Sequence, residues 1–252
     1  WRHVFGIEDM SSHEFGILEA LYDAELFYTD YRLGKFLDRL KEQQLYDNSL
    51  IIITSDHGEN IGEHNLMDHQ YCLYNTLLHI PLIVKYPTWL DIGDERVDEL
   101  TTTLDIFPTI QSILQDKPRD SLDGVPLPPI GNPIPNRNLL AEYLGPFPAI
   151  ESIRSNHPEA DSETLKELDR SIDAVQNSSE KFIMYGDGLT EYFDLVNDPD
   201  ERENLIEDLP KDKEKMFKNI IKQKKGGRVD AKETPDRTDS VRQNLEDLGY
   251  LG

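Results

Sequence analysis

The chain has 252 residues, of which 37% are hydrophobic and 30% charged, so it can bury a sizeable core and is not disordered throughout. Its 49 acidic residues outnumber 26 basic ones and give a formal net charge of -23, which repels nucleic acid and anionic membranes. No apolar stretch approaches the roughly 18 residues of a membrane span. We therefore expect neither a nucleic-acid partner nor a membrane span. The acidity is spread along the whole chain, which we interpret as the solvation of a salt-adapted protein.

The predicted elements of the first half are a long helix, two strands and a shorter helix. Apolar residues recur at steps of three and four over residues 14–45, which predicts an amphipathic helix. Continuous apolar runs follow at 50–54 and 81–86, and such runs are typical of strands covered on both faces of a parallel sheet. Asp105 is then predicted to cap a helix that runs to about Leu114.

The second half of the chain differs in amino-acid composition. Prolines crowd residues 117–148, which predicts an irregular crossover, and residues 151–180 are polar and partly helical. Residues 181–195 read as a β-hairpin, and 210–240 as a mobile tail rich in Lys, Asp and Gly. The predicted fold is α/β: a partial, mostly parallel sheet flanked by helices over 1–130, then a small α+β subdomain with an antiparallel hairpin and a tail over 131–252.

The sharpest chemical feature is the sequence TSDHGE at 54–59, directly after the first predicted strand. Polar groups at the carboxyl end of a parallel strand are where α/β folds bind ligands. Asp56 and His57 offer a carboxylate oxygen and an imidazole nitrogen, which suits a divalent metal, and Gly58 lets the backbone turn close by. A helix-capping Ser-Asp pair with an incidental histidine explains these residues equally well.

Histidines are dense downstream of this motif. Three of the seven in the chain, at 57, 64 and 69, fall within 13 residues. Their spacing does not match HExxH, which disfavours a zinc protease. His79 is interpreted as a structural or surface residue. The single cysteine, Cys72, stands beside apolar residues and is expected to be a buried, inert thiol.

Six blocks in the same order resemble the sulfatases, in particular arylsulfatase-like members of the alkaline phosphatase superfamily. The blocks are ITSDHGE at 53–59 with GEH at 62–64, LHIPLIV at 78–84, DIFPT at 105–109, LDGVPL at 122–127, EYFDL at 191–195 with DPDE at 198–201 and NL at 204–205, and LGYL at 248–251. The resemblance implies a sulfuric ester hydrolase that acts on a small-molecule or glycan sulfate ester.

The resemblance also assigns roles to three residues. Asp56 and His57 occupy the positions of family ligands for a divalent cation, usually Ca²⁺, with Mg²⁺ and Mn²⁺ as alternatives. Asp56 is further implied to act on the hydroxyl of the nucleophile. His69 stands where many members have a lysine that binds a sulfate oxygen, and a protonated imidazole can also donate to that anion.

The family nucleophile, a formylglycine made within a C/S-x-P/A-x-R motif, has no counterpart in this sequence, and neither do the paired aspartates of the metal site. The resemblance places both ahead of residue 1, so we expect a C-terminal half with little turnover alone. A phosphodiester or phosphonate monoester hydrolase on the same fold, and a non-catalytic half that binds a partner, remain alternatives. The sequence leaves the oligomeric state and the compartment open, with the cytoplasm favoured.

Overall fold

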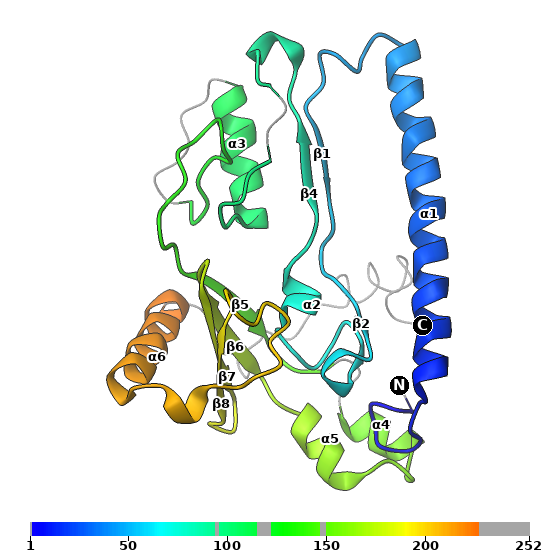
Figure 1. Cartoon of the computed structure of the whole chain (residues 1–252), viewed down its shortest axis with the longest axis vertical. Helices are drawn as coiled ribbons and strands as arrows, with labels where there is room; N and C mark the ends of the chain where they lie inside the picture. The colour runs from blue at the N-terminus through cyan, green and yellow to red at the C-terminus, as the bar shows by residue number, and fades with distance from the viewer. Residues whose placement is uncertain (1, 94–95, 115–121, 147–149, 227–252) are drawn as a thin grey trace, which may run out of the picture.

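The computed structural model describes residues 2–93, 96–114, 122–146 and 150–226 (Figure 1). Its longest element is α1 (Ser12–Glu42), which forms one margin of the molecule. A capping box starts this helix: the Ser11 hydroxyl accepts from the backbone N–H of Glu14, whose carboxylate accepts from the N–H of Ser11 at 2.8 Å. The predicted helix is thus confirmed, although none of its residues is buried.

The two predicted strands exist as β1 (Ile51–Thr54) and β4 (Leu82–Lys85). They pair with each other antiparallel, Ile51 opposite Lys85 and Thr54 opposite Leu82. Every strand pair in the described residues is antiparallel, so the mostly parallel sheet expected from the sequence is not found there. Continuous apolar runs indicate that both faces of a strand can be covered, but they do not specify the direction of its neighbour.

A small irregular unit lies between these two strands and holds the candidate site. It contains β2 (Asn60–Ile61), a 3₁₀ turn at Glu63–Asn65, β3 (Met67–Asp68) and the one-turn helix α2 (Asn75–Leu78). Strands β2 and β3 form a two-residue antiparallel ladder. The polypeptide therefore folds back on itself soon after β1 ends.

The second half is built on an antiparallel four-stranded meander. Its strands are β5 (Leu139–Tyr143), β6 (Ile172–Gln176), β7 (Glu180–Tyr185) and β8 (Thr190–Asp194), in that spatial order. The predicted hairpin is confirmed as β7–β8. The other two strands were missed, β5 because prolines surround it and β6 because its alternation is short.

Alternate residues of the meander pack into two separate hydrophobic cores. Ile172, Ile183 and Phe193 pack with the buried segment 72–77. Val175 and Phe182 face the opposite way and pack against Phe217 and its neighbours on α6 (Lys211–Lys225). This two-sided burial follows from the period of two in a strand. The first core joins segment 72–77, beside the candidate site, to the second half of the chain.

The remaining helices are α3 (Ile106–Ile113), α4 (Ile150–Asn156) and α5 (Ser162–Leu168), with 3₁₀ turns at Thr88–Leu90, Thr103–Asp105 and Ile206–Asp208. The predicted capping role of Asp105 is wrong, because its side chain makes no capping hydrogen bond to α3. The carboxylate is buried and instead accepts from the backbone N–H of Thr102 at 3.0 Å and pairs with Arg137 at 2.8 Å.

The mobile tail predicted over 210–240 is wrong for residues 211–225. Residues 211–225 form α6, which is stabilised because Phe217 and Ile221 are buried. Residues 227–240 lie outside the described residues. The boundary between 130 and 131 stays a prediction. No helix in the described residues is long and apolar enough to cross a membrane.

Candidate metal and anion site

The candidate site begins where β1 ends. The Ser55 hydroxyl donates to the backbone carbonyl of His57 at 2.6 Å, which closes a tight turn. Gly58 then donates its N–H to the carbonyl of Leu77 at 2.9 Å. A Cβ on Gly58 would stand 1.9 Å from the carbonyl oxygen of Thr76, so only glycine fits here. This close contact fixes the turn against α2.

Buried Asn60 holds the returning strand in place. Its amide donates to the carbonyl of Asp68 at 2.9 Å, and its Oδ1 accepts from the Thr76 hydroxyl at 2.7 Å. Asp68 and Tyr71 both adopt positive φ angles, 74° and 72°, which residues other than glycine seldom do. Such backbone persists only where surrounding contacts impose it. Asn60 supplies part of that constraint and brings His69 back toward His57.

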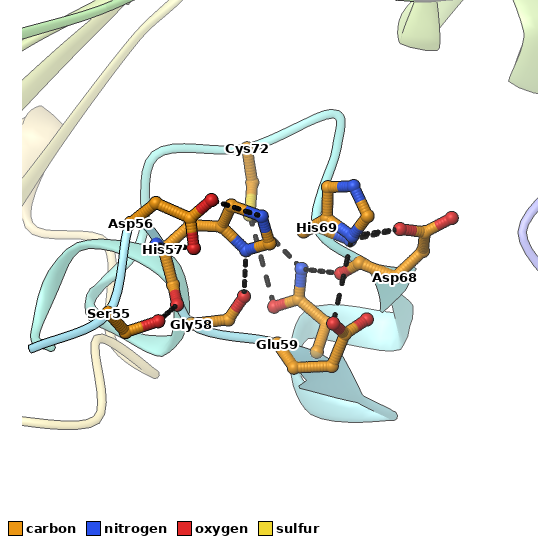
Figure 2. Close-up of polar contacts among 9 residues, drawn as sticks. Ser55, Asp56, His57, Gly58, Glu59, Asp68, His69 and Cys72 are labelled. Atoms are coloured by element: carbon orange, nitrogen blue, oxygen red, sulfur yellow. Dashed lines mark hydrogen bonds and ion pairs between the residues drawn. The ribbon is translucent and has the colours of Figure 1, made fainter. Parts of the chain in front are cut away.

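Two histidines and one glutamate meet at this point (Figure 2). The rings of His57 and His69 stack with centroids 4.3 Å apart and planes inclined by 19°. One donor atom from each of His57, Glu59 and His69 lies within 4.8 Å of the others. Ligand bonds of about 2.0–2.2 Å place two ligands at most about 4.4 Å apart, so a shared ion requires the three donor atoms to lie slightly closer together than this limit of 4.8 Å.

The hydrogen bonds define which nitrogen atoms carry protons. His57 Nδ1 lies 2.8 Å from the carbonyl of Gly58, and because a carbonyl only accepts, Nδ1 donates. Its Nε2 consequently has a lone pair available to a metal. His69 Nδ1 lies 2.5 Å from Asp68 Oδ1 and 3.6 Å from Glu59 Oε2, so it donates to a carboxylate. A metal that used this nitrogen would displace that proton.

The pKa values of the two carboxylates beside His57 are shifted in opposite directions. Burial raises the pKa of Glu59, and the neighbouring charge of His69 opposes the rise. Asp56 behaves differently, because a hydrogen bond from its own backbone N–H and the nearby His57 both lower its pKa. Glu59 is thus the partly buried carboxylate inside the cluster, whereas the side chain of Asp56 is 88% exposed.

The structure brings the three residues predicted from the sequence into one neighbourhood. Asp56 Oδ2 lies 3.8 Å from His57 Nε2, and Asp56 and Asp68 flank the two imidazoles on opposite sides. Asp56 is not a member of the tight triad, and the roles of Asp56, His57 and His69 stay predictions. Glu59 was missed as a site residue, although it stands two residues after His57 in the same motif.

The other candidate residues lie outside the cluster. His64 stacks on Tyr74 with ring centroids 3.7 Å apart. His79 is exposed at the end of α2, as expected for a surface residue. Cys72 is buried, and burial raises the pKa of its thiol, which agrees with an inert role.

Comparison with known proteins identifies the segment that carries this cluster. Residues 18–115 match the family model described as Sulfatase. These residues are therefore similar to part of a sulfatase domain. Arylsulfatase K of Canis lupus familiaris is 28% identical over 197 residues, which cover 77% of this chain and 34% of that protein. All the residues of the candidate site lie inside this sulfatase segment.

Two further relatives carry other names. The multifunctional alkaline phosphatase superfamily protein PehA of Trinickia caryophylli is 30% identical over 200 residues, or 76% of this chain and 37% of PehA. The crystal structure of the phosphonate monoester hydrolase of Agrobacterium radiobacter superposes with a TM-score of 0.66 at 25% identity, over 85% of this chain and 42% of that one. The chain spans about a third of the length of the curated relatives it matches, 34% and 37%.

Proposed function

We propose that this chain supplies part of the divalent-metal and anion site of a sulfuric ester hydrolase. The observation that carries the proposal is the triad of His57, Glu59 and His69 at the end of β1, inside the sulfatase segment. The substrate class is a sulfate ester of a small molecule or glycan. The nucleophile motif of the family is not present in these 252 residues. We therefore expect the chain alone to turn over little or no substrate.

The donor set bears on the choice of metal. Ca²⁺, expected from the family resemblance, takes about 6 to 8 oxygen ligands, and Mg²⁺ is also held by oxygen. Two imidazoles and one carboxylate instead suit a transition ion, and Mn²⁺ is the transition ion among the three that the resemblance allows. We therefore favour Mn²⁺ at the triad. Asp56 can add a carboxylate ligand, because its Oδ2 lies 3.8 Å from Nε2 of His57. Such an ion, when bound, supplies Lewis-acid neutralisation of charge on the ester oxygens.

His69 has two nitrogens with different surroundings. Nδ1 is turned toward Asp68 and Glu59, whereas the second ring nitrogen points away from both carboxylates (Figure 2). The contact of Nδ1 with Asp68 orients the ring. With Nδ1 as a metal ligand, the single proton of the ring would sit on the outward nitrogen, and this N–H would donate to a substrate oxygen, which is the role expected of His69 in place of the family lysine.

Metal binding by the full chain tests the proposal. We expect weak binding of Mn²⁺ in calorimetry, because three protein ligands leave the rest of the shell to water. Glu59→Gln and His57→Ala should each lower the affinity roughly tenfold or more, since even outer residues of metal sites cost 10–100-fold. His79→Ala, an exposed histidine outside the cluster, is the matched control and should bind like the wild type. Equal affinity in all four proteins would remove the triad as the site.

A phosphonate or phosphate ester hydrolase is the second candidate, favoured by the likeness to PehA and to the phosphonate monoester hydrolase. The two candidate functions can be separated with a fusion protein. It joins the full chain to the part of PehA outside the 200-residue alignment, and PehA itself is the reference. We expect the ratio of kcat/KM for 4-nitrophenyl sulfate over phenylphosphonate monoester to rise in the fusion. A fall in that ratio would favour the second candidate.

A further inference from the structure

Helix α6 is positively charged in a chain that is otherwise strongly acidic. Its seven lysines and two acidic residues give it a net charge of +5, so the whole-chain charge of -23 leaves -28 for the other residues. Figure 1 shows α6 at the margin of the molecule, on the other side of the meander from α1. The positive potential of such a helix extends over about one Debye length, roughly 8 Å at physiological ionic strength. The helix therefore attracts anions locally, although the chain as a whole repels them.

Two of the lysines attach α6 to the meander. Lys213 pairs with Glu180 of β7, and Lys225 pairs with Asp173 of β6 at 2.8 Å. Phe217 is buried between them on the same helix and packs against the meander. These contacts fix the orientation of α6 and so decide which of its sides meets solvent.

Four other lysines follow one side of the helix, and we refer to them as the lysine stripe. They are Lys211, Lys215, Lys218 and Lys222. Their spacing of four, three and four residues brings them to the same side of an α-helix. At a rise of 1.5 Å per residue, the lysine stripe is about 16 Å long. It is therefore a row of cationic groups and not a compact cluster.

Most of the charge of the lysine stripe is uncompensated. Glu214 pairs with Lys211 at 3.2 Å and with Lys218 at 2.7 Å. Lys215 and Lys222 are exposed, and in the described residues neither has an ion pair. Four lysines and one glutamate leave a net charge of +3 along this side of α6.

The form of the lysine stripe favours a linear polysulfated glycan as its ligand. A single sulfate group cannot contact lysines spread over about 16 Å, whereas sulfate groups repeated along a polymer can. An anionic membrane is disfavoured, because the apolar side chains Phe217 and Ile221 are buried against the meander and are not available for insertion. Nucleic acid is disfavoured, because α6 contains no arginine and no exposed aromatic side chain.

We propose that the lysine stripe is an accessory surface that binds a polysulfated glycan substrate, an inference that rests on the proposed function. Helix α6 and segment 72–77, beside the candidate site, pack on opposite faces of the meander. The stripe therefore holds the glycan away from the ester at the triad, and only a polymer can contact both places. It raises the affinity for polymeric substrates and does not affect the binding of a small sulfate ester.

Binding of heparin to the full chain tests the proposal, with heparin as a polysulfated probe and fluorescence anisotropy as the measurement. We expect Lys211→Gln, Lys215→Gln and Lys222→Gln, combined in one variant, to lower the affinity by roughly tenfold or more. The variant should also show a weaker dependence of affinity on salt, because fewer counterions are released on binding. Arginine at the same three positions keeps the charge and should keep the affinity.

The matched control removes three lysines elsewhere. Lys35→Gln and Lys41→Gln in α1, combined with Lys166→Gln in α5, also change exposed residues and give the same net charge of -26. This variant should bind heparin like the wild type. Wild-type affinity in the stripe variant would overturn the proposal, and so would an equal loss of affinity in the control.

Other polyanions identify the class of ligand. Hyaluronan, a glycan with carboxylates and no sulfates, should bind roughly tenfold or more weakly than heparin, because fewer charges meet the lysines. Tighter binding of single-stranded DNA or of phosphatidylserine vesicles than of heparin would assign the stripe to nucleic acid or to a membrane and overturn the proposal.

The proposal and the proposed function can fail separately. Heparin binding that depends on the lysine stripe, in a chain whose triad binds no Mn²⁺, would leave the glycan surface intact and overturn the proposed function alone. Binding of Mn²⁺ by the triad without stripe-dependent binding of heparin would do the reverse.

Discussion

Gly58 occupies a position where the backbone leaves no room for a side chain. A methyl group there would lie 1.9 Å from the carbonyl oxygen of Thr76, so the turn after β1 would have to move away from α2. We expect Gly58→Ala to lower the free energy of unfolding by about 1–3 kcal/mol, the usual cost of overpacking. The same substitution should weaken Mn²⁺ binding, because His57 and Glu59 flank this turn.

The matched control is Gly34→Ala in α1, where no atom lies within 4 Å of the added methyl group. Alanine in a helix should raise the free energy of unfolding by about 0.5–1 kcal/mol. Urea denaturation of the three proteins measures both effects. Equal stability of the Gly58→Ala variant and the wild type would contradict the close contact.

His64 makes the stability depend on pH. Burial lowers the pKa of His64, an effect that the charges of Glu201 and Glu191 oppose. Because the folded pKa lies below the unfolded value of about 6.5, the unfolded chain binds more protons in the interval between them. Stability therefore falls as the pH drops through that interval, and the contribution is constant above it.

The test compares urea unfolding at about pH 7.5 and pH 5 in three proteins. His64→Asn should show a smaller loss of stability on acidification than the wild type, and asparagine tolerates the positive φ of 52° at this position. His79→Asn, at an exposed position outside the stack, should keep the wild-type dependence. Parallel curves for the wild type and His64→Asn would contradict the assignment.

At the scale of elements, a buried ion pair joins the meander to segment 73–75. Lys181 of β7 pairs with Glu201 at 2.6 Å, and both side chains are at most 1% exposed. Lys181 also donates to the carbonyl of Leu73 and to Asn75 Oδ1, while Glu201 accepts from the N–H of Asn75. Segment 73–75 leads into the helix that holds the turn of the candidate site.

Removing one partner of this pair should be costly. We expect Glu201→Gln to lower the free energy of unfolding by about 3–5 kcal/mol, because an uncompensated charge stays buried on Lys181. Glu42→Gln is the control: its ion pair with Arg39 lies at the surface, with the two side chains 66% and 67% exposed, and contributes about 0–1 kcal/mol. Similar losses in both variants, measured by urea denaturation, would contradict the difference in burial.

At the scale of the whole molecule, the net charge of -23 predicts a dependence on salt. Self-repulsion is screened as the Debye length falls from about 30 Å at 0.01 M to about 3 Å at 1 M salt. We expect the Tm to rise when KCl is raised over that range, measured by calorimetry. A neutral osmolyte at matched osmolality is the control for non-electrostatic effects. A flat or falling Tm would contradict the interpretation of a salt-adapted protein.

Local patterns in the sequence were sufficient for several elements and for part of the site. The three- and four-residue period predicts α1, the apolar runs locate β1 and β4, and alternation around Gly186 predicts the β7–β8 hairpin. Each of these features depends on residues near one another in the chain. The adjacency of Asp56 and His57 is local in the same way.

Tertiary structure decided the rest. The antiparallel pairing of β1 with β4 and the stacking of His57 on His69 depend on how the intervening chain folds back. The Lys181–Glu201 pair is buried because the meander packs on segment 72–77, a contact between distant parts of the sequence. Periodicity reports which face of an element can be buried, whereas the partner on that face is selected by packing and hydrogen bonding across the whole fold.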